Sequence, residues 1–192
     1  MVAKIVAATS DLLRAEGPEA VTTNRVAEIT GISKGSIYQY FRTKEDIIVA
    51  AIRDTAERQT PTVRAMLTEI ALEPPREMID AAIDILIAFS TDNAATIRYL
   101  AKYPEFSREV EPDSDMPMLM QTMVTMHVRQ YRDQYRPDLE PENIAWLFIN
   151  SAIATTLLYF ESSRRIDLQQ FRMGLKHMAY GLLADGATAD HR

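Results

Sequence analysis

A short stretch near the N-terminus gathers the side chains best suited to bind another molecule. It contributes Thr22, Thr23, Asn24, Ser33, Lys34, Gly35, Ser36, Tyr38, Gln39, Tyr40 and Lys44. Hydroxyl groups and a helix N-terminus bind phosphates, and the two lysines add positive charge. Gln39 can form paired hydrogen bonds with a base edge, preferentially that of adenine. These residue types predict a surface that binds double-stranded DNA.

Two short helices joined by a tight turn would position these side chains. The expected order is a cap at Thr22 or Thr23, a helix through Val26–Ile29, a turn at 31–33 and a second helix over 34–40, capped by Ser33. Gly31 tolerates the positive φ that such a turn usually needs. Val26, Ile32, Ile37 and Phe41 supply an apolar underside. The pattern predicts a helix-turn-helix.

The same stretch contains a competing motif of a different chemistry. Residues 31–35 match G-x-S-x-G, the nucleophile turn of serine hydrolases. That motif needs a buried strand before it and a sheet that places a histidine and an acid, whereas a helix precedes it here. The chain has three dispersed histidines and no cysteine. We therefore expect no catalytic residues, no transition-metal site and no cofactor.

Charge is distributed unevenly along the chain. The formal net charge is −6, yet residues 1–58 hold eight Lys/Arg and eight Asp/Glu, so the acidity lies in the remainder. Binding of phosphates needs a local positive surface and not a basic protein. No membrane helix or signal peptide is expected, which favours the cytoplasm by default.

The fold class expected from the sequence is all-α, with about nine helices. Glycine is scarce, and no alternating strand pattern with a hairpin turn is present. We expect a three-helix DNA-binding domain at 1–48 and a larger helical bundle at 49–192 for ligand sensing and dimerisation. Residues 43–46 resemble a capping box, with Asp46 in place of the usual Glu, that starts a helix at Lys44. Pro61 could stop or merely kink that helix. Pro141 and Asp167 suit the starts of the last two helices.

The middle of the chain is rich in methionine and aromatic residues. Methionine adapts its shape and often lines permissive pockets. The candidate contacts for a small apolar or amphipathic ligand are Phe89, Tyr99, Tyr103, Met120, Met123, Trp146 and Tyr159. Ordinary core packing is the alternative for any one of them.

The last two helices carry apolar stripes at three- and four-residue spacing. The predicted dimer contacts are Phe148, Ala152, Thr155, Tyr159, Phe171, Leu175 and Met178. Small residues such as Ala152 would permit close approach of two helices. The alternative is that both stripes pack only inside the monomer.

The block from Val21 to Ile48 resembles the TetR family of bacterial regulators. The resemblance rests on residues 31–41, in particular Tyr38-x-Tyr40-Phe41-x-x-Lys44. It implies that 34–41 is a recognition helix and that Thr23, Ser36, Tyr38, Tyr40 and Lys44 contact the DNA backbone. One departure is that Lys4 is the only basic residue before or early in the first helix, where many members carry several.

The resemblance also implies how such a protein works. It implies a homodimer held by a four-helix bundle, a ligand cavity, and a repressor that a ligand releases from a palindromic operator. The sequence leaves two other classes of protein open. One is a small all-helical enzyme, and the other is a DNA-binding dimer that senses no ligand.

Overall fold

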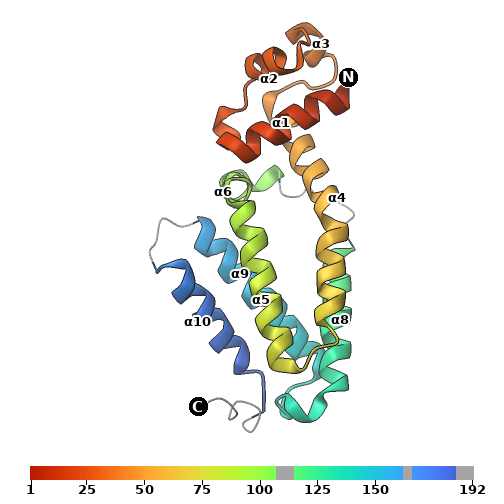
Figure 1. Ribbon diagram of the computed structural model, residues 1–192, viewed down its shortest axis with the longest axis vertical. Coiled ribbons are helices and arrows are strands. Elements are labelled where there is room, and N and C mark those ends of the chain that lie inside the picture. The colour runs from red at the N-terminus through yellow and green to blue at the C-terminus, as the bar shows by residue number, and fades with distance from the viewer. Residues whose placement is uncertain (107–114, 162–165, 185–192) are drawn as a thin grey trace. The chain divides into compact units, whose positions relative to one another are not determined.

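The computed structural model describes residues 1–106, 115–161 and 166–184 (Figure 1). Within these ranges the regular elements are nine α-helices and two short 3-10 helices, together with a single antiparallel bridge between Tyr135 and Leu183. The all-α fold predicted from the sequence is confirmed. The chain divides into two compact units, which are described separately.

The first unit combines residues 1–61 with a later segment that begins at Asn93. Its elements are α1 (Val2–Glu16), η1 (Pro18–Ala20), α2 (Thr23–Thr30), α3 (Lys34–Tyr38), the first part of α4 (Lys44–Ile70) and α6 (Ala94–Lys102). The unit is therefore larger than the predicted domain of residues 1–48, because it extends along α4 and includes a helix from the middle of the chain.

The core of the first unit is built from one face of α1, α2, α3, α4 and α6. Ile5, Ile37 and Ile48 are fully buried in it. Tyr99 of α6 joins this core, and Tyr103 and Phe106 pack against it. The three rings contact one another, with centroids 4.9 to 6.1 Å apart. Burial raises the pKa of the Tyr99 phenol to about 12.

The second unit is a bundle that begins after Pro61. It contains the end of α4, α5 (Pro75–Asp92), α8 (Met116–Gln130), η2 (Arg132–Gln134), α9 (Pro141–Glu161) and α10 (Leu168–Tyr180). Helix α5 packs against both α9 and α10, and α8 packs against α9 (Figure 1). The core between them includes Ile79, Ile83, Val128, Phe148 and Leu175.

Buried polar groups fix the lower end of this bundle. The His127 ring of α8 lies with Nε2 2.8 Å from the carbonyl oxygen of Glu73 and Nδ1 3.0 Å from the hydroxyl of Tyr135. A carbonyl can only accept, so Nε2 carries the proton and Nδ1 accepts from Tyr135. Burial lowers the pKa of His127 below its ordinary value of 6.5. The neutral imidazole thus joins the turn between α4 and α5 to α8 and to the segment before α9.

An ionic network joins α5 to α10. Lys176 lies 3.0 Å from Asp84 and 3.7 Å from Asp80, and the Tyr180 hydroxyl donates to Asp80. The Arg76 guanidinium lies over the Tyr180 ring. Burial and the hydrogen bond with Asp80 raise the pKa of Tyr180 to about 12. These contacts hold α10 in register along α5.

Several helix boundaries follow local signals in the sequence. Asp167 caps α10 by accepting from the backbone N–H of Gln170 at 2.9 Å. Pro141 opens α9, as expected for a residue whose fixed φ suits a first turn. Pro61 lies inside α4, which continues to Ile70. The structure thus decides a point that the sequence left open, since one lost backbone hydrogen bond does not end the helix.

Candidate nucleic-acid interface

A tight turn sets the relation between α2 and α3. The Thr22 hydroxyl caps α2 by accepting from the N–H of Arg25, and Gly31 ends the helix in the left-handed region with φ 66°. The Ser33 hydroxyl then caps α3 by accepting from the N–H of Ser36 at 3.2 Å. A left-handed residue at this position favours glycine, because a side chain would be strained there. The predicted helix-turn-helix is confirmed in each of these features.

The underside of the pair is apolar and anchors it to the unit. Val26 and Ile37 are fully buried, Phe41 is nearly so, and Ile32 packs against the same cluster. The Thr30 hydroxyl donates to the carbonyl of Val26 and accepts from the N–H of Ile32. Both hydrogen bonds tighten the end of α2. The opposite face is therefore held rigidly toward the outside.

Most of the predicted DNA-binding residues lie on that outer face. Thr22, Asn24, Ser33, Lys34, Gly35, Tyr38, Gln39, Tyr40 and Lys44 are exposed, and Ser36 is half-buried. The tyrosine rings are large apolar groups that remain about half exposed, at 53% for Tyr38 and 52% for Tyr40. Exposed aromatic rings beside hydroxyl and amide groups suit contact with a partner surface. The arrangement presents them on two consecutive elements.

Thr23 differs from its neighbours. Its side chain is buried, and the Tyr38 hydroxyl lies 3.5 Å from the Thr23 hydroxyl. This contact links the first turn of α2 to the end of α3. The Thr23 side chain thus packs between the helices, although its backbone N–H stands at the open N-terminus of α2, where no intrahelical partner exists.

Helix α3 is shorter than the sequence predicts. It ends at Tyr38, and Gln39 and Tyr40 form a turn in which the Tyr40 N–H donates to the Ile37 carbonyl. The next helix starts with a reciprocal cap. The Asp46 carboxylate accepts from the N–H groups of Arg42 and Thr43, while the Thr43 hydroxyl accepts from the N–H of Asp46. The predicted capping box with aspartate is therefore present, and it places Lys44 in the first turn of α4.

Ion pairs lower the positive charge of this surface. The Arg25 guanidinium makes two hydrogen bonds of 2.6 Å with the Glu16 carboxylate, which lowers the pKa of Glu16. Lys44 lies 3.8 Å from Glu45. The sequence reasoning missed the Arg25–Glu16 pair, since nine residues separate the partners and no helical spacing relates them. The pair ties the end of α1 to the first turn of α2.

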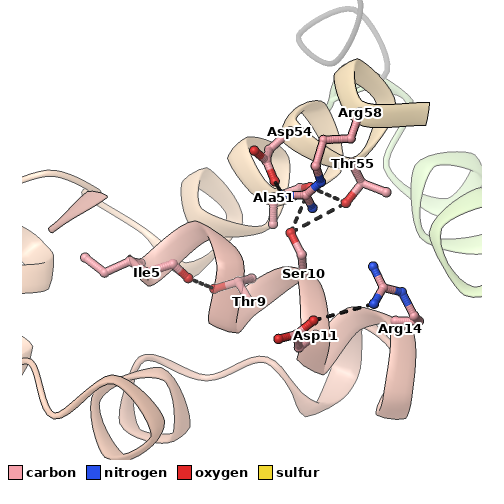
Figure 2. A network of polar contacts seen from close by, with 9 residues as sticks. All are labelled: Ile5, Thr9, Ser10, Asp11, Arg14, Ala51, Asp54, Thr55 and Arg58. Atoms are coloured by element: carbon pink, nitrogen blue, oxygen red, sulfur yellow. Dashed lines mark hydrogen bonds and ion pairs between the residues drawn. The ribbon is translucent and has the colours of Figure 1, made fainter. Parts of the chain in front are cut away.

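A polar contact joins α1 to α4 behind the helix-turn-helix (Figure 2). The buried Ser10 hydroxyl donates to the Ala51 carbonyl at 3.3 Å, and the Thr55 hydroxyl donates to the same carbonyl at 2.9 Å. The two hydroxyl oxygens lie 3.5 Å apart. Helix α4 is thereby attached directly to the unit that carries α2 and α3.

The seven candidate ligand contacts lie in different environments. Tyr99 and Tyr103 belong to the core of the first unit. In the second unit, Met120 and Met123 are half-buried, and Tyr159 stacks on Phe171 with ring centroids 4.0 Å apart. Trp146 is 58% exposed and Phe89 is 38% exposed. The seven side chains thus belong to two different units, and their role in ligand binding stays a prediction.

The candidate dimer contacts are also divided. Phe148, Ala152, Phe171 and Leu175 are buried inside the second unit, and Thr155 and Tyr159 are half-buried. Met178 is 61% exposed. The stripes seen in the sequence are thus mainly the faces that pack within the monomer.

Helix α9 is apolar on its outer side as well. Among the described helices it alone is long and apolar enough to cross a membrane by length and composition, which is weak evidence for a membrane segment. No cluster of three or more metal-ligating side chains occurs in the part of the chain that the structure describes.

Comparison with known proteins identifies the first unit. Residues 5–51 match the family described as bacterial regulatory proteins, tetR family. This match covers α1, α2, α3 and the start of α4. This part of the chain is a TetR-type DNA-binding domain. The protein is a DNA-binding transcriptional regulator. A search of curated proteins found no match.

Solved TetR-like structures share the fold over nearly the whole chain. A putative regulator from Saccharomonospora viridis in complex with choline has a TM-score of 0.69 at 18% identity, covering 95% of this chain and 96% of its own. NalD, the secondary repressor of the MexAB-OprM multidrug efflux pump in Pseudomonas aeruginosa, has a TM-score of 0.65 at 14% identity, covering 96% of each chain.

A third similar structure is FadR from Bacillus subtilis in complex with stearoyl-CoA. Its TM-score is 0.62 at 13% identity, with 96% of this chain and 100% of that chain covered. At identities this low, the likeness to these three structures shows a common fold and nothing more.

Proposed function

We propose that this protein is a homodimeric repressor of the TetR type that binds a palindromic operator and leaves it when a small molecule binds. The observation that carries the DNA-binding part is the outer face of α2 and α3. There Tyr38, Gln39 and Tyr40 stand exposed on a rigid, capped helix-turn-helix. Lys44 and the N-termini of both helices would meet phosphates, while Gln39 is the candidate for base contact.

A dimer would explain why apolar side chains are exposed on the outer sides of α9 and α10. The exposed residues of α9 include Trp146, Leu147, Ser151, Ala154, Leu157 and Leu158, with no charged residue between Glu142 and Glu161. Most of those of α10, together with Gly181 directly after it, form one stripe at three- and four-residue steps: Gln170, Met173, Gly174, His177, Met178 and Gly181. A helix that is apolar all round requires cover on both sides. We propose a second copy of the chain as that cover.

This assignment moves the interface relative to the sequence-based expectation. Phe148, Ala152, Phe171 and Leu175 already fill the monomer core, so they are not available to a partner. The proposed contacts lie on the opposite sides of the same two helices, with Met178 retained. The second copy also accounts for the apolar composition of α9 without a membrane, which is consistent with a cytoplasmic regulator.

The dimer would set the distance between the two recognition helices. In two-fold symmetric helix-turn-helix proteins the two recognition helices lie about 34–36 Å apart, one turn of DNA. An effector that prefers a different arrangement of the two copies lowers DNA affinity in proportion to its differential affinity for the two states. The relatives solved with choline and with stearoyl-CoA bind small molecules in this same fold. Their ligands support an effector for this chain without naming it.

The test starts from DNA fragments of the source genome. The purified protein is used to select bound fragments, and the enriched sequence is footprinted on both strands. We expect two protected half-sites related by a two-fold axis, about one helical turn apart. Failure to enrich any sequence at low salt would overturn the proposal, and protection of a single half-site would remove its dimeric part.

A further inference from the structure

One buried hydroxyl group in the second unit forms no hydrogen bond in the monomer. Thr156 of α9 is fully buried, and its Oγ1 has no hydrogen-bond partner. It continues the inward face of α9 that carries Phe148 and Ala152. A buried polar group without a partner costs about 1–3 kcal/mol. Native proteins rarely leave such a group unpaired, so each case needs an explanation.

Other threonines of the chain show what this hydroxyl would normally do. Thr9, Thr30, Thr55, Thr60, Thr68 and Thr91 all lie inside helices and donate to the carbonyl four residues earlier, at 2.6 to 2.9 Å. This local bond is open to any threonine in a helix interior. Thr156 does not form it. Its hydroxyl is therefore available to form a hydrogen bond with a group outside its own helix.

The neighbours of Thr156 along its own helix are apolar. Ala152 and Tyr159 are its neighbours on the same face of α9, and the Tyr159 ring stacks on Phe171 of α10. In the described part of the second unit, the buried polar side chains are Ser90, Thr125, His127 and Thr156, and none of them carries a charge at neutral pH. His127 is already bonded on both ring nitrogens.

We infer that Thr156 is the polar anchor of the effector site, and that the effector is a neutral, mainly apolar molecule with one hydroxyl or carbonyl oxygen. This inference rests on the proposed effector-controlled function. No charged residue lies on α9 between Glu142 and Glu161, so an ionised head group beside Thr156 would lose its water without gaining a counter-charge from that helix, which is costly. A neutral oxygen needs only the single hydrogen bond that Thr156 offers. The inferred class differs from the choline and stearoyl-CoA of the two relatives, which carry charges.

The first experiment measures the stability of the ligand-free dimer at fixed protein concentration. Thr156→Val removes the unpaired hydroxyl and keeps the shape, so we expect the melting temperature to rise by about 2–6 °C. Thr9→Val is the matched control, because Thr9 is also fully buried in a helix but its hydroxyl is bonded to Ile5. We expect no rise for Thr9→Val. A fall for Thr156→Val would show that its hydroxyl has a partner, and the inference would be overturned.

The second experiment compares three probes of equal chain length: 1-decanol, decanoate and decyltrimethylammonium, below their aggregation limits. Release of the selected DNA and the shift in melting temperature are both recorded. We expect 1-decanol to act on the unaltered protein, about tenfold more weakly on Thr156→Val, and nearly unchanged on Thr156→Ser, which keeps the hydroxyl.

The outcomes separate this inference from the proposed function. A stronger response to decanoate or to the ammonium probe, no response to any probe, or an equal response of Thr156→Val to 1-decanol would overturn the neutral effector anchored at Thr156. DNA binding by the unaltered protein is recorded in the same assay without a probe. Its absence would instead overturn the proposed function itself.

Discussion

The two units differ in where they keep their apolar side chains. In the described part of the first unit the exposed large apolar residues are few, and beyond the first two residues they are Ile29, Tyr38 and Tyr40. In the second unit α9 and α10 expose Trp146, Leu147, Leu157, Leu158, Met173 and Met178 in addition to a filled core. The first unit has covered its own apolar surface and offers a polar face. In the second unit, α9 and α10 have apolar side chains on two sides, and only the inner side is covered by other helices of the unit.

Both units have exposed ion pairs and buried hydroxyl groups, but the buried hydroxyl groups differ in their partners. In the first unit those of Thr9, Ser10 and Thr30 are hydrogen-bonded, whereas that of Thr156 in the second unit has no partner. Exposed ion pairs are worth little, whereas buried polar groups are costly when unpaired. Substitutions at the outer face of the second unit should therefore have large effects, and those at the DNA face should have small effects that depend on salt.

The strongest test of this contrast is Gly174→Arg on α10. A Cβ at Gly174 meets nothing within 4 Å, so the monomer accepts the side chain, and the loss of a helical glycine favours the helix by about 1 kcal/mol. In the proposed dimer the same side chain would be a buried charge without a partner. We expect a folded monomer by sedimentation at micromolar concentration, with operator affinity reduced on the order of 100-fold because the second half-site is lost.

Gln169→Arg is the control on the same helix. Gln169 is exposed and lies at the N-terminal edge of the stripe, away from its centre at Gly174 and Met178. We expect it to remain a dimer with normal operator affinity. A Gly174→Arg protein that sediments as a dimer would place the interface elsewhere and leave the outer side of α9 unexplained.

Lowering the pH should destabilise the second unit before it destabilises the first. The folded-state pKa of His127 lies below its ordinary value of 6.5. The unfolded chain therefore binds a proton at a pH where the folded chain does not, so the stabilisation is complete above about pH 6.5 and is lost as the pH falls toward the folded pKa. Protonation would also turn Nδ1 into a donor facing Tyr135. We expect the melting temperature to drop by a few degrees between about pH 7.5 and pH 5.

His127→Gln supplies the comparison, since glutamine keeps polar atoms but does not titrate. We expect it to be less stable than the unaltered protein at neutral pH and to lose less stability on acidification. The measurement is the difference between the two melting curves across pH. Parallel pH dependence of the two proteins would remove His127 as the cause.

The smallest effect is expected at the DNA face. Lys44 is about half exposed and lies 3.8 Å from Glu45, so its charge is partly screened before DNA arrives. Lys44→Ala should weaken binding several-fold for all DNA sequences alike and reduce the slope of log affinity against log salt by about one. Titrations of operator and unrelated DNA at several salt concentrations measure both quantities. An effect confined to the operator would make Lys44 a base-reading residue and not a phosphate contact.

The sequence by itself determined the parts governed by local physics. Gly31 after a capped helix, Ser33 before the next one and Thr43 with Asp46 each act within four residues, and the structure has all three features as predicted. Short-range hydrogen bonds and the need for a positive φ leave few alternatives there. The outward position of Tyr38, Gln39 and Tyr40 follows from the buried Ile37 and Phe41 beside them.

Only the tertiary structure decided which apolar face of α9 and α10 turns inward. Each helix has apolar residues on two sides, and helical spacing alone cannot rank the two sides. The sequence therefore predicts Phe148 and Ala152 as partner contacts, although both are buried in the monomer. The same limit applies to Tyr99, whose helix joins the first unit across a long separation in sequence. Burial depends on what lies opposite a side chain, and residues distant in the chain supply that surface.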